Sequence, residues 1–141
     1  MTSKIVYEGN LRTRATHLRS GQEIITDAPV DNQGKGEAFS PTDLVATALG
    51  SCMITIMGIR ARDNGIDIEG TTCEVNKIMG SGPRRISRVE LKIQLPEKPY
   101  TAEQKALLEE AARGCPVCRS LSNELEVDLQ FVWPVIEELK N

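Results

Sequence analysis

The strongest constraint on the fold is one segment, residues 44–59, in which nearly every side chain is apolar. Before it, Ser40 is a favourable N-cap, Pro41 suits the first helical position and Asp43 can complete a capping box. Asn64 and Gly65 are typical of a helix end. A helix with no polar face has to be enclosed by a sheet or by a second subunit. The sequence therefore predicts a long buried helix from Pro41 to about residue 62.

Short β-prone runs lie on both sides of this helix. Strands are predicted at residues 5–7, 12–18, 23–26, 71–78, 87–95 and 127–133, and further helices at 101–113, from Pro116 and at 134–140. The order β-β-β-α-β-β-α-α-β predicts an α+β fold. At 141 residues the chain is long enough for one core and too short for two ordinary ones, so a single domain over residues 1–141 is expected.

Charge and hydropathy restrict the partners and the compartment. A net charge of −3 argues against nucleic acid, because phosphate binding needs a basic face. The first residues show no apolar leader, and the apolar segment is shorter than the ~20 residues of a membrane span. We therefore expect a cytoplasmic protein with neither a nucleic acid nor a membrane as its partner. Cysteines in that reducing compartment are catalytic, metal-binding or simply buried.

Two of the four cysteines, Cys115 and Cys118, form a C-x-x-C with a proline inside. A structural zinc site needs four ligands, and with a single histidine, His17, either Cys52 or Cys73 would have to join, so no metal is expected. A thioredoxin-type pair would follow a strand, whereas this motif follows a predicted helix. Cys115 is the predicted N-cap of the next helix, where free N–H groups and the helix dipole should lower its pKa.

The other two cysteines, Cys52 and Cys73, leave alternatives open. Cys52 lies within the apolar helix between small neighbours, and it is either a small buried hydrophobe or a functional thiol. Cys73 lies in a predicted strand, where plain packing is the simpler interpretation.

Two signatures change this assessment. The segment FSPTDLVATALGSC, residues 39–52, resembles the S-P-x-x-L…A-L-x-x-C signature of the OsmC/Ohr family, and CPVCR, residues 115–119, resembles that family's second, C-P-V-S-like signature. They occur in the family's order, with a predicted hairpin between them. The resemblance covers essentially the whole chain. It implies an OsmC-like fold, in which antiparallel sheets wrap around long buried central helices in an intertwined homodimer.

The resemblance also implies a thiol-based peroxidase, a peroxiredoxin-like enzyme of the oxidative stress response. Its best-known members reduce hydroperoxides, especially organic ones. Carried over, Cys52 would be the peroxidatic thiolate, which becomes a sulfenic acid, and Cys115 the resolving thiol that forms a disulfide with it. A dithiol reductant would restore both thiols, and neither a metal nor an organic cofactor is needed.

The chain departs from the family pattern at Thr42, where active peroxidases carry a glutamate paired with an arginine that holds the thiolate. Asp43 would have to turn inward, or Glu37 reach in, to supply a carboxylate. The arginine aligns best with Arg12, with Arg14 and Arg19 as alternatives. An arginine near Cys52 would lower the pKa of that thiol.

Three functions follow from these residues. The first is reduction of lipid or alkyl hydroperoxides, with Leu49, Met53 and Ile56 either lining an apolar pocket or belonging to the core. The alternative is a stress-response or small-molecule-binding protein with little peroxidase activity, because of Thr42. A minor alternative is a disulfide oxidoreductase acting through Cys115 and Cys118, where the family commonly has serine at the second position. Cys118 is then either a secondary resolving thiol or a tolerated small residue.

Overall fold

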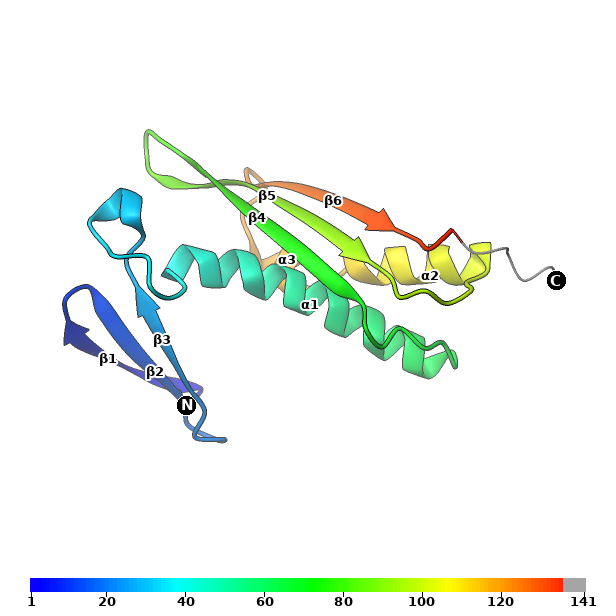
Figure 1. Ribbon diagram of the computed structural model, residues 1–141, viewed down its shortest axis with the longest axis horizontal. Helices are drawn as coiled ribbons and strands as arrows, with labels where there is room; N and C mark the ends of the chain where they lie inside the picture. The colour runs from blue at the N-terminus through cyan, green and yellow to red at the C-terminus, as the bar shows by residue number, and fades with distance from the viewer. Residues whose placement is uncertain (136–141) are drawn as a thin grey trace. The chain divides into compact units, whose positions relative to one another are not determined.

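A computed structural model describes residues 1–135 and shows the predicted α+β order of elements (Figure 1). The elements are β1 (Ser3–Gly9), β2 (Arg12–His17), β3 (Glu23–Asp27), the 3-10 turn η1 (Val30–Asn32), α1 (Pro41–Asp63), β4 (Thr72–Gly80), β5 (Arg85–Gln94), α2 (Ala102–Arg113), α3 (Pro116–Ser120) and β6 (Glu126–Val132). Only η1 was not expected. The helix predicted at 134–140 falls mostly outside the described residues.

Contacts divide the chain into two units, residues 1–45 and the residues from Ala46 onward. The first contains an antiparallel sheet in the order β1-β2-β3, with Arg12 of β2 opposite Asp27 of β3. It also contains the start of α1, where the predicted capping box is present. The Ser40 amide donates to Asp43 Oδ2 (2.9 Å), and the Asp43 amide donates to Ser40 Oγ (3.0 Å).

The second unit contains a sheet in the order β4-β5-β6. The β4–β5 hairpin is antiparallel, as expected, but β5 and β6 are parallel. The chain between β5 and β6 crosses over through α2 and α3 and so returns in the same direction. The described sheets are therefore antiparallel except at this one pairing.

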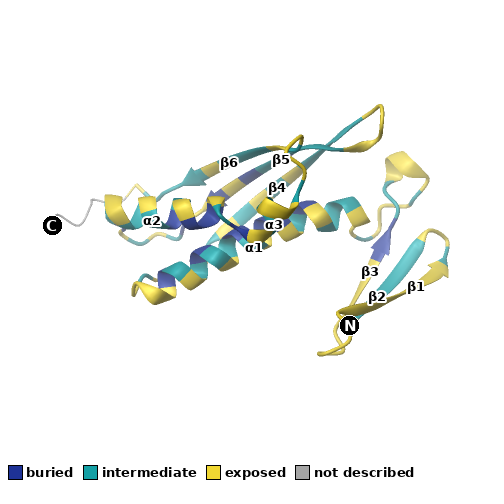
Figure 2. Ribbon diagram, turned by 180° about the vertical axis from the view of Figure 1, so that it is seen from behind, coloured by how far each residue is buried: buried dark blue, intermediate teal, exposed yellow. Residues whose placement is uncertain are grey.

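The core lies between this sheet and one face of α1. That face is made of small and flexible side chains: Ala46, Leu49, Gly50, Met53, Met57 and Ala61. Val89, Leu91 and Ile93 of β5 pack toward it, and Figure 2 shows the buried stripe along α1 and β5. Gly50 lets α1 lie close to strand β4, because a Cβ at this position would be only 3.0 Å from a methyl group of Val75.

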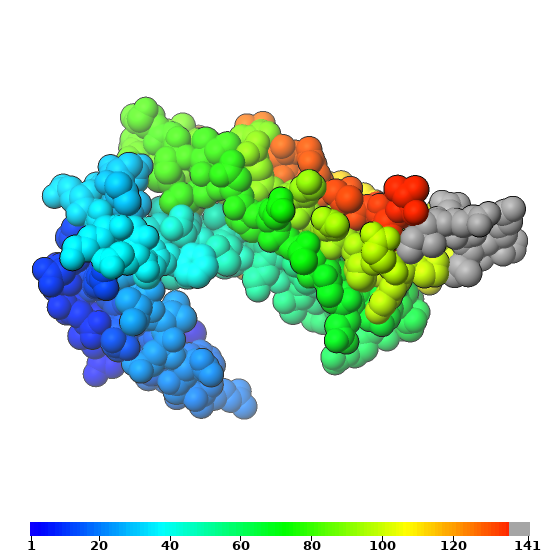
Figure 3. All heavy atoms as spheres, in the orientation of Figure 1, coloured from blue at the N-terminus to red at the C-terminus, as the bar shows by residue number. Residues whose placement is uncertain are grey.

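The opposite face of α1 is not enclosed by the other described elements of the second unit. Ile59 is 54% exposed, and Ser51 and Thr55 are exposed as well. Atoms of α1 (cyan to green) reach the surface in the space-filling view of Figure 3. By length and hydropathy α1 could also cross a bilayer, but core helices of soluble proteins pass the same test, and α1 packs into a core. The predicted burial of α1 thus holds on one face.

Candidate active site

Two of the predicted site residues meet in the second unit, where α3 lies beside the middle of α1 (Figures 1 and 2). Cys52, on α1, is partly exposed, and Cys115, the N-cap of α3, is 0% exposed. The two thiols are close enough to interact, since the Cys52 side chain contributes to raising the pKa of Cys115. Both are free thiols. The structure therefore brings together two cysteines that are far apart in sequence.

The end of α2 determines where Cys115 lies. Leu108, Ala111 and Ala112 form the buried face of α2 and carry the following residues into the core. The Gly114 amide donates back to the Ala111 carbonyl (3.2 Å) and ends the helix. Pro116 then begins α3, because a proline at the first position lacks only an N–H that the helix would leave unpaired anyway.

The Cys115 thiol does not have the lowered pKa that its N-cap position predicts. Burial raises its pKa above the ordinary thiol value. The Cys118 N–H donates to Cys115 Sγ (3.3 Å) and acts in the opposite direction, but more weakly, whereas the nearby Cys52 side chain raises the pKa further. The expectation of a lowered pKa at Cys115 was therefore wrong, because burial outweighs one hydrogen bond from a helix of only five residues.

Cys118 lies on the first turn of α3 and is partly exposed. Cys115 therefore has both other cysteines beside it: the Cys118 amide donates to its sulfur, and the Cys52 side chain contributes to its raised pKa. Within residues 1–135, no three His, Cys, Asp or Glu side chains are placed to hold a metal ion. Cys115 is thus the member of this group that contacts both other cysteines.

Cys73, on β4, packs against a different face of α1. Its Sγ would lie 3.2 Å from a Cβ on Gly50, which is two residues from Cys52 and so about 200° around the helix. Burial raises the pKa of the Cys73 thiol. Its contacts are those of a packing residue, as the sequence indicated.

In the N-terminal unit, Arg12 has acidic partners that the sequence did not all reveal. Its guanidinium donates to Glu37 Oε1 and lies 3.6 Å from Asp27 Oδ2. Asp27 is 1% exposed and also accepts the Glu37 amide (3.1 Å). Asp27 was missed, although the register of the β2–β3 hairpin, which pairs it with Arg12, is a signal that could have identified it.

The other predicted residues of this unit have different contacts. Arg14 pairs with Glu8 (3.0 Å), and Asp43 serves in the helix cap. Thr42 shares a hydrogen bond with the Ser40 hydroxyl (3.1 Å). Of the two carboxylates considered for the place of the family glutamate, Glu37 is the one that binds Arg12.

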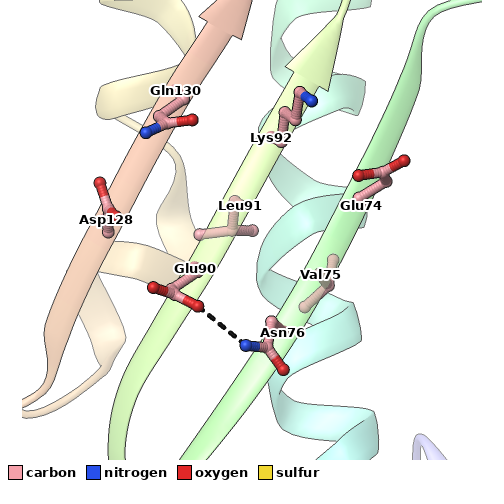
Figure 4. Close-up of a pocket in the computed structure, with 8 residues that line it drawn as sticks. All are labelled: Glu74, Val75, Asn76, Glu90, Leu91, Lys92, Asp128 and Gln130. Atoms are coloured by element: carbon pink, nitrogen blue, oxygen red, sulfur yellow. Dashed lines mark hydrogen bonds between the residues drawn. The ribbon is translucent and has the colours of Figure 1, made fainter.

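Two further expectations concern pockets. Leu49 and Met53 are 0% and 1% exposed in the core, so they do not line an accessible pocket; Ile56 is partly exposed. The outer face of the second sheet carries a shallow depression of about 440 Å³. Figure 4 shows its polar side chains, including Asn76 hydrogen-bonded to Glu90 (2.8 Å), with α1 behind the sheet. This depression contains no cysteine.

These observations define a class of protein: an α+β chain with one cysteine on its central helix and a second on the N-cap of a later helix. The sequence profile of the OsmC-like protein family matches residues 34–130, and the chain belongs to this family. No curated protein matches the chain.

Solved structures agree with the assignment. A Psychrobacter arcticus protein named for osmotic stress induction and a detoxification response is 51% identical, with 94% of this chain and 95% of that chain covered and a TM-score of 0.86. Organic hydroperoxide resistance proteins of Legionella pneumophila (18% identity, 96% and 98% covered, TM-score 0.71) and Elizabethkingia anophelis (20%, 94% and 96%, 0.72) share the fold.

Proposed function

We propose that the protein is a thiol-dependent reductase of organic hydroperoxides, acting through Cys52 and Cys115. The observation that supports this most is that Cys52 and Cys115 meet in one core cluster and interact with each other, because a resolving thiol has to reach the sulfur that the peroxide oxidises. The names of relatives with the same fold, which refer to organic hydroperoxide resistance, agree with this substrate class.

The reaction proceeds in two steps at these sulfurs. The Cys52 thiolate attacks the terminal oxygen of the hydroperoxide, the O–O bond breaks, and the alkoxide leaves as an alcohol after taking a proton. The resulting Cys52 sulfenic acid condenses with the Cys115 thiol, which forms the disulfide and releases water. An external dithiol then reduces the disulfide and is itself oxidised. No step requires a metal or an organic cofactor.

Arg12 is proposed as the cation that favours the Cys52 thiolate, and Glu37 as the carboxylate that orients Arg12 in place of the glutamate replaced by Thr42. The support for Glu37 is its hydrogen bond with the Arg12 guanidinium. Arg12 belongs to the first unit and Cys52 to the second, so the effect of Arg12 on the Cys52 thiol stays a prediction. Asp43 stays a weaker candidate, because one of its oxygens already caps α1.

We also propose that the working form is a homodimer in the cytoplasm. A second copy would cover the exposed face of α1, where Ile59 is uncovered, and the apolar residues exposed on the first sheet, which include Ile5, Tyr7 and Ile24. Apolar surface of this extent is typical of an interface. Sedimentation of the purified protein would measure the association directly, and a monomer at micromolar concentration would contradict this proposal.

The peroxidase proposal is tested by mixing reduced protein with cumene hydroperoxide or hydrogen peroxide in the presence of dithiothreitol. We expect consumption of both, faster for the organic peroxide. Cys52→Ser should abolish consumption. Cys115→Ser should leave a Cys52 sulfenic acid that a dimedone probe captures. Cys73→Ser is the matched control and should behave like the wild type, because Cys73 packs against another face of α1.

A different result would favour the second candidate function, a stress-response or small-molecule-binding protein. The specific observation behind it is Thr42, whose hydroxyl bonds Ser40 and carries no charge to hold an arginine. If the wild type consumes neither peroxide while its thiols are fully reduced, the peroxidase proposal is wrong. If Cys115 and Cys118 become oxidised although neither peroxide is consumed, the disulfide oxidoreductase is favoured instead.

A further inference from the structure

The buried position of Cys115 creates a difficulty for the last step of the proposed reaction. Once Cys52 and Cys115 are joined, an external dithiol has to attack one of their two sulfurs. Cys115 is 0% exposed, so no external dithiol can reach its sulfur without a local opening. Attack on the partly exposed Cys52 would bring the reductant to the same sulfur that reacts with the peroxide in the proposed mechanism.

Cys118 can reach the Cys115 sulfur from within the protein. Its own N–H already donates to Cys115 Sγ at 3.3 Å, and its thiol interacts electrostatically with that of Cys115. Positions three residues apart on a helix have Cβ atoms about 5–6 Å apart. A disulfide needs Cβ atoms about 3.5–4.5 Å apart, so the first turn of α3 has to tighten by roughly 1–2 Å for the bond to form.

We propose that Cys118 is an exit thiol, which takes the disulfide over from Cys52 by attacking the buried Cys115 sulfur. This proposal rests on the proposed function. The Cys118 thiolate forms the new S–S bond, the Cys52–Cys115 bond breaks, and Cys52 leaves as a thiolate. The proton lost by Cys118 goes to solvent, and the number of disulfides does not change. An external dithiol then reduces the Cys115–Cys118 disulfide through attack on the sulfur of Cys118, a residue that is partly exposed.

This exchange separates the reaction with peroxide from the reduction by an external dithiol, which would otherwise both take place at the Cys52 sulfur. Cys52 regains its thiolate as soon as the disulfide has moved, so it can meet another hydroperoxide before the external reductant arrives. The reductant, in turn, acts at α3 and does not need to enter the place where the peroxide binds. The C-x-x-C spacing at the start of α3 thereby has a purpose in a reaction whose first disulfide joins residues far apart in sequence.

The first test does not depend on peroxide. Reduced Cys52→Ser protein is treated with one equivalent of diamide, acid-quenched, alkylated and mapped by mass spectrometry. We expect a Cys115–Cys118 disulfide as the main product. If Cys115 and Cys118 both stay alkylatable, the exchange is ruled out. Cys73→Ser, combined with Cys52→Ser, serves as the control and should give the same disulfide.

The second test follows the wild type after one equivalent of cumene hydroperoxide. The Cys52–Cys115 disulfide should form first and then give way to Cys115–Cys118 with Cys52 free. In Cys118→Ser the first disulfide should persist, and turnover with thioredoxin as the dithiol should fall several-fold. A wild type that retains only Cys52–Cys115, with Cys118→Ser equally fast, would overturn the proposal.

The two tests also distinguish a failure of the exchange from a failure of the proposed function. If cumene hydroperoxide oxidises no cysteine, the peroxidase proposal is wrong, and the diamide experiment still decides whether Cys118 can bond Cys115. If the peroxide forms Cys52–Cys115 but diamide yields no Cys115–Cys118, the peroxidase stands and the exit thiol does not.

Discussion

Replacing Gly50 by valine should destabilise the protein far more than the same change at Gly58 on the same helix. A Cβ at Gly50 would lie 3.0 Å from Val75 Cγ2, 3.2 Å from Cys73 Sγ and 3.3 Å from Leu91 Cδ2. A Cβ at Gly58 would meet nothing within 4 Å. Both substitutions exchange glycine for valine inside α1, so the change in helix propensity is the same and cancels in the comparison.

The magnitude follows from how little the neighbours can move. Val75 and Leu91 are directly opposite in the β4–β5 ladder, and Leu91 is buried. Overpacking a filled core costs about 1–3 kcal/mol. Valine adds two methyl groups beyond the Cβ that is already too close, so we expect about 3 kcal/mol at Gly50. At Gly58 the small gain in helix propensity, a few tenths of a kcal/mol, should remain.

Urea unfolding at one fixed protein concentration measures the difference. For a slope of roughly 1.5 kcal/mol/M, a loss of 3 kcal/mol moves the midpoint by about 2 M. Gly50→Val should show this shift and should also lose the proposed peroxidase activity, because Cys52 lies on the same turn of α1. Equal midpoints for Gly50→Val and Gly58→Val would refute the packing argument. A loss at Gly58 alone would mean that a second subunit packs closely on that face.

Four further predictions test the candidate site and the residues that support it. In Cys52→Ser, iodoacetamide labelling of Cys115 should require a pH above the ordinary thiol value of 9.0, because burial raises its pKa; a midpoint at or below 9.0 would contradict this. The same shift contributes stability below pH 9.0 that is lost as the pH rises through the raised pKa, which urea midpoints against pH would show. Arg12→Met should cost about 1–3 kcal/mol, since the buried Asp27 loses its nearby cation, measured by thermal unfolding. Thr101→Ala should cost about 1 kcal/mol by the same assay, because it removes the capping box of α2.

The predictions from sequence that the structure confirms rest on local rules. The start of α1 followed from the capping box of Ser40 and Asp43, and the start of α3 from Pro116 after Cys115. Both depend only on residues within one turn, so the sequence contains all the information needed. The parallel pairing of β5 with β6 depends on where α2 and α3 return the chain, and no short stretch of sequence contains that information.

The same distinction applies to the site. The signatures pointed to Cys52 and Cys115, and the structure places them in contact. The sequence did not identify Asp27, because nothing in its local sequence distinguishes a buried aspartate at a strand end from an exposed one. The cross-strand partner Arg12 is what marks Asp27 as part of the site, and this partner can be identified only when the β2–β3 register is known. Leu49 and Met53 were ambiguous for a related reason, since helical spacing shows that they share a face but not what that face meets.

The pKa of Cys115 is set by a local hydrogen bond and by burial in the core, which act in opposite directions, and the balance matters for the proposed peroxidase mechanism. Local structure offers an N–H from Cys118, which favours a thiolate, whereas burial and the neighbouring Cys52 favour the thiol, and the second effect is larger. A protonated Cys115 is unreactive toward peroxide, because only thiolates attack the O–O bond. In the proposed mechanism Cys115 therefore has to lose its proton before it can attack an oxidised Cys52. In the proposed mechanism, oxidation would turn Cys52 into an uncharged sulfenic acid, and the electrostatic contribution of Cys52 to the raised pKa of Cys115 would disappear. Oxidation of the first cysteine would therefore itself make the second more reactive.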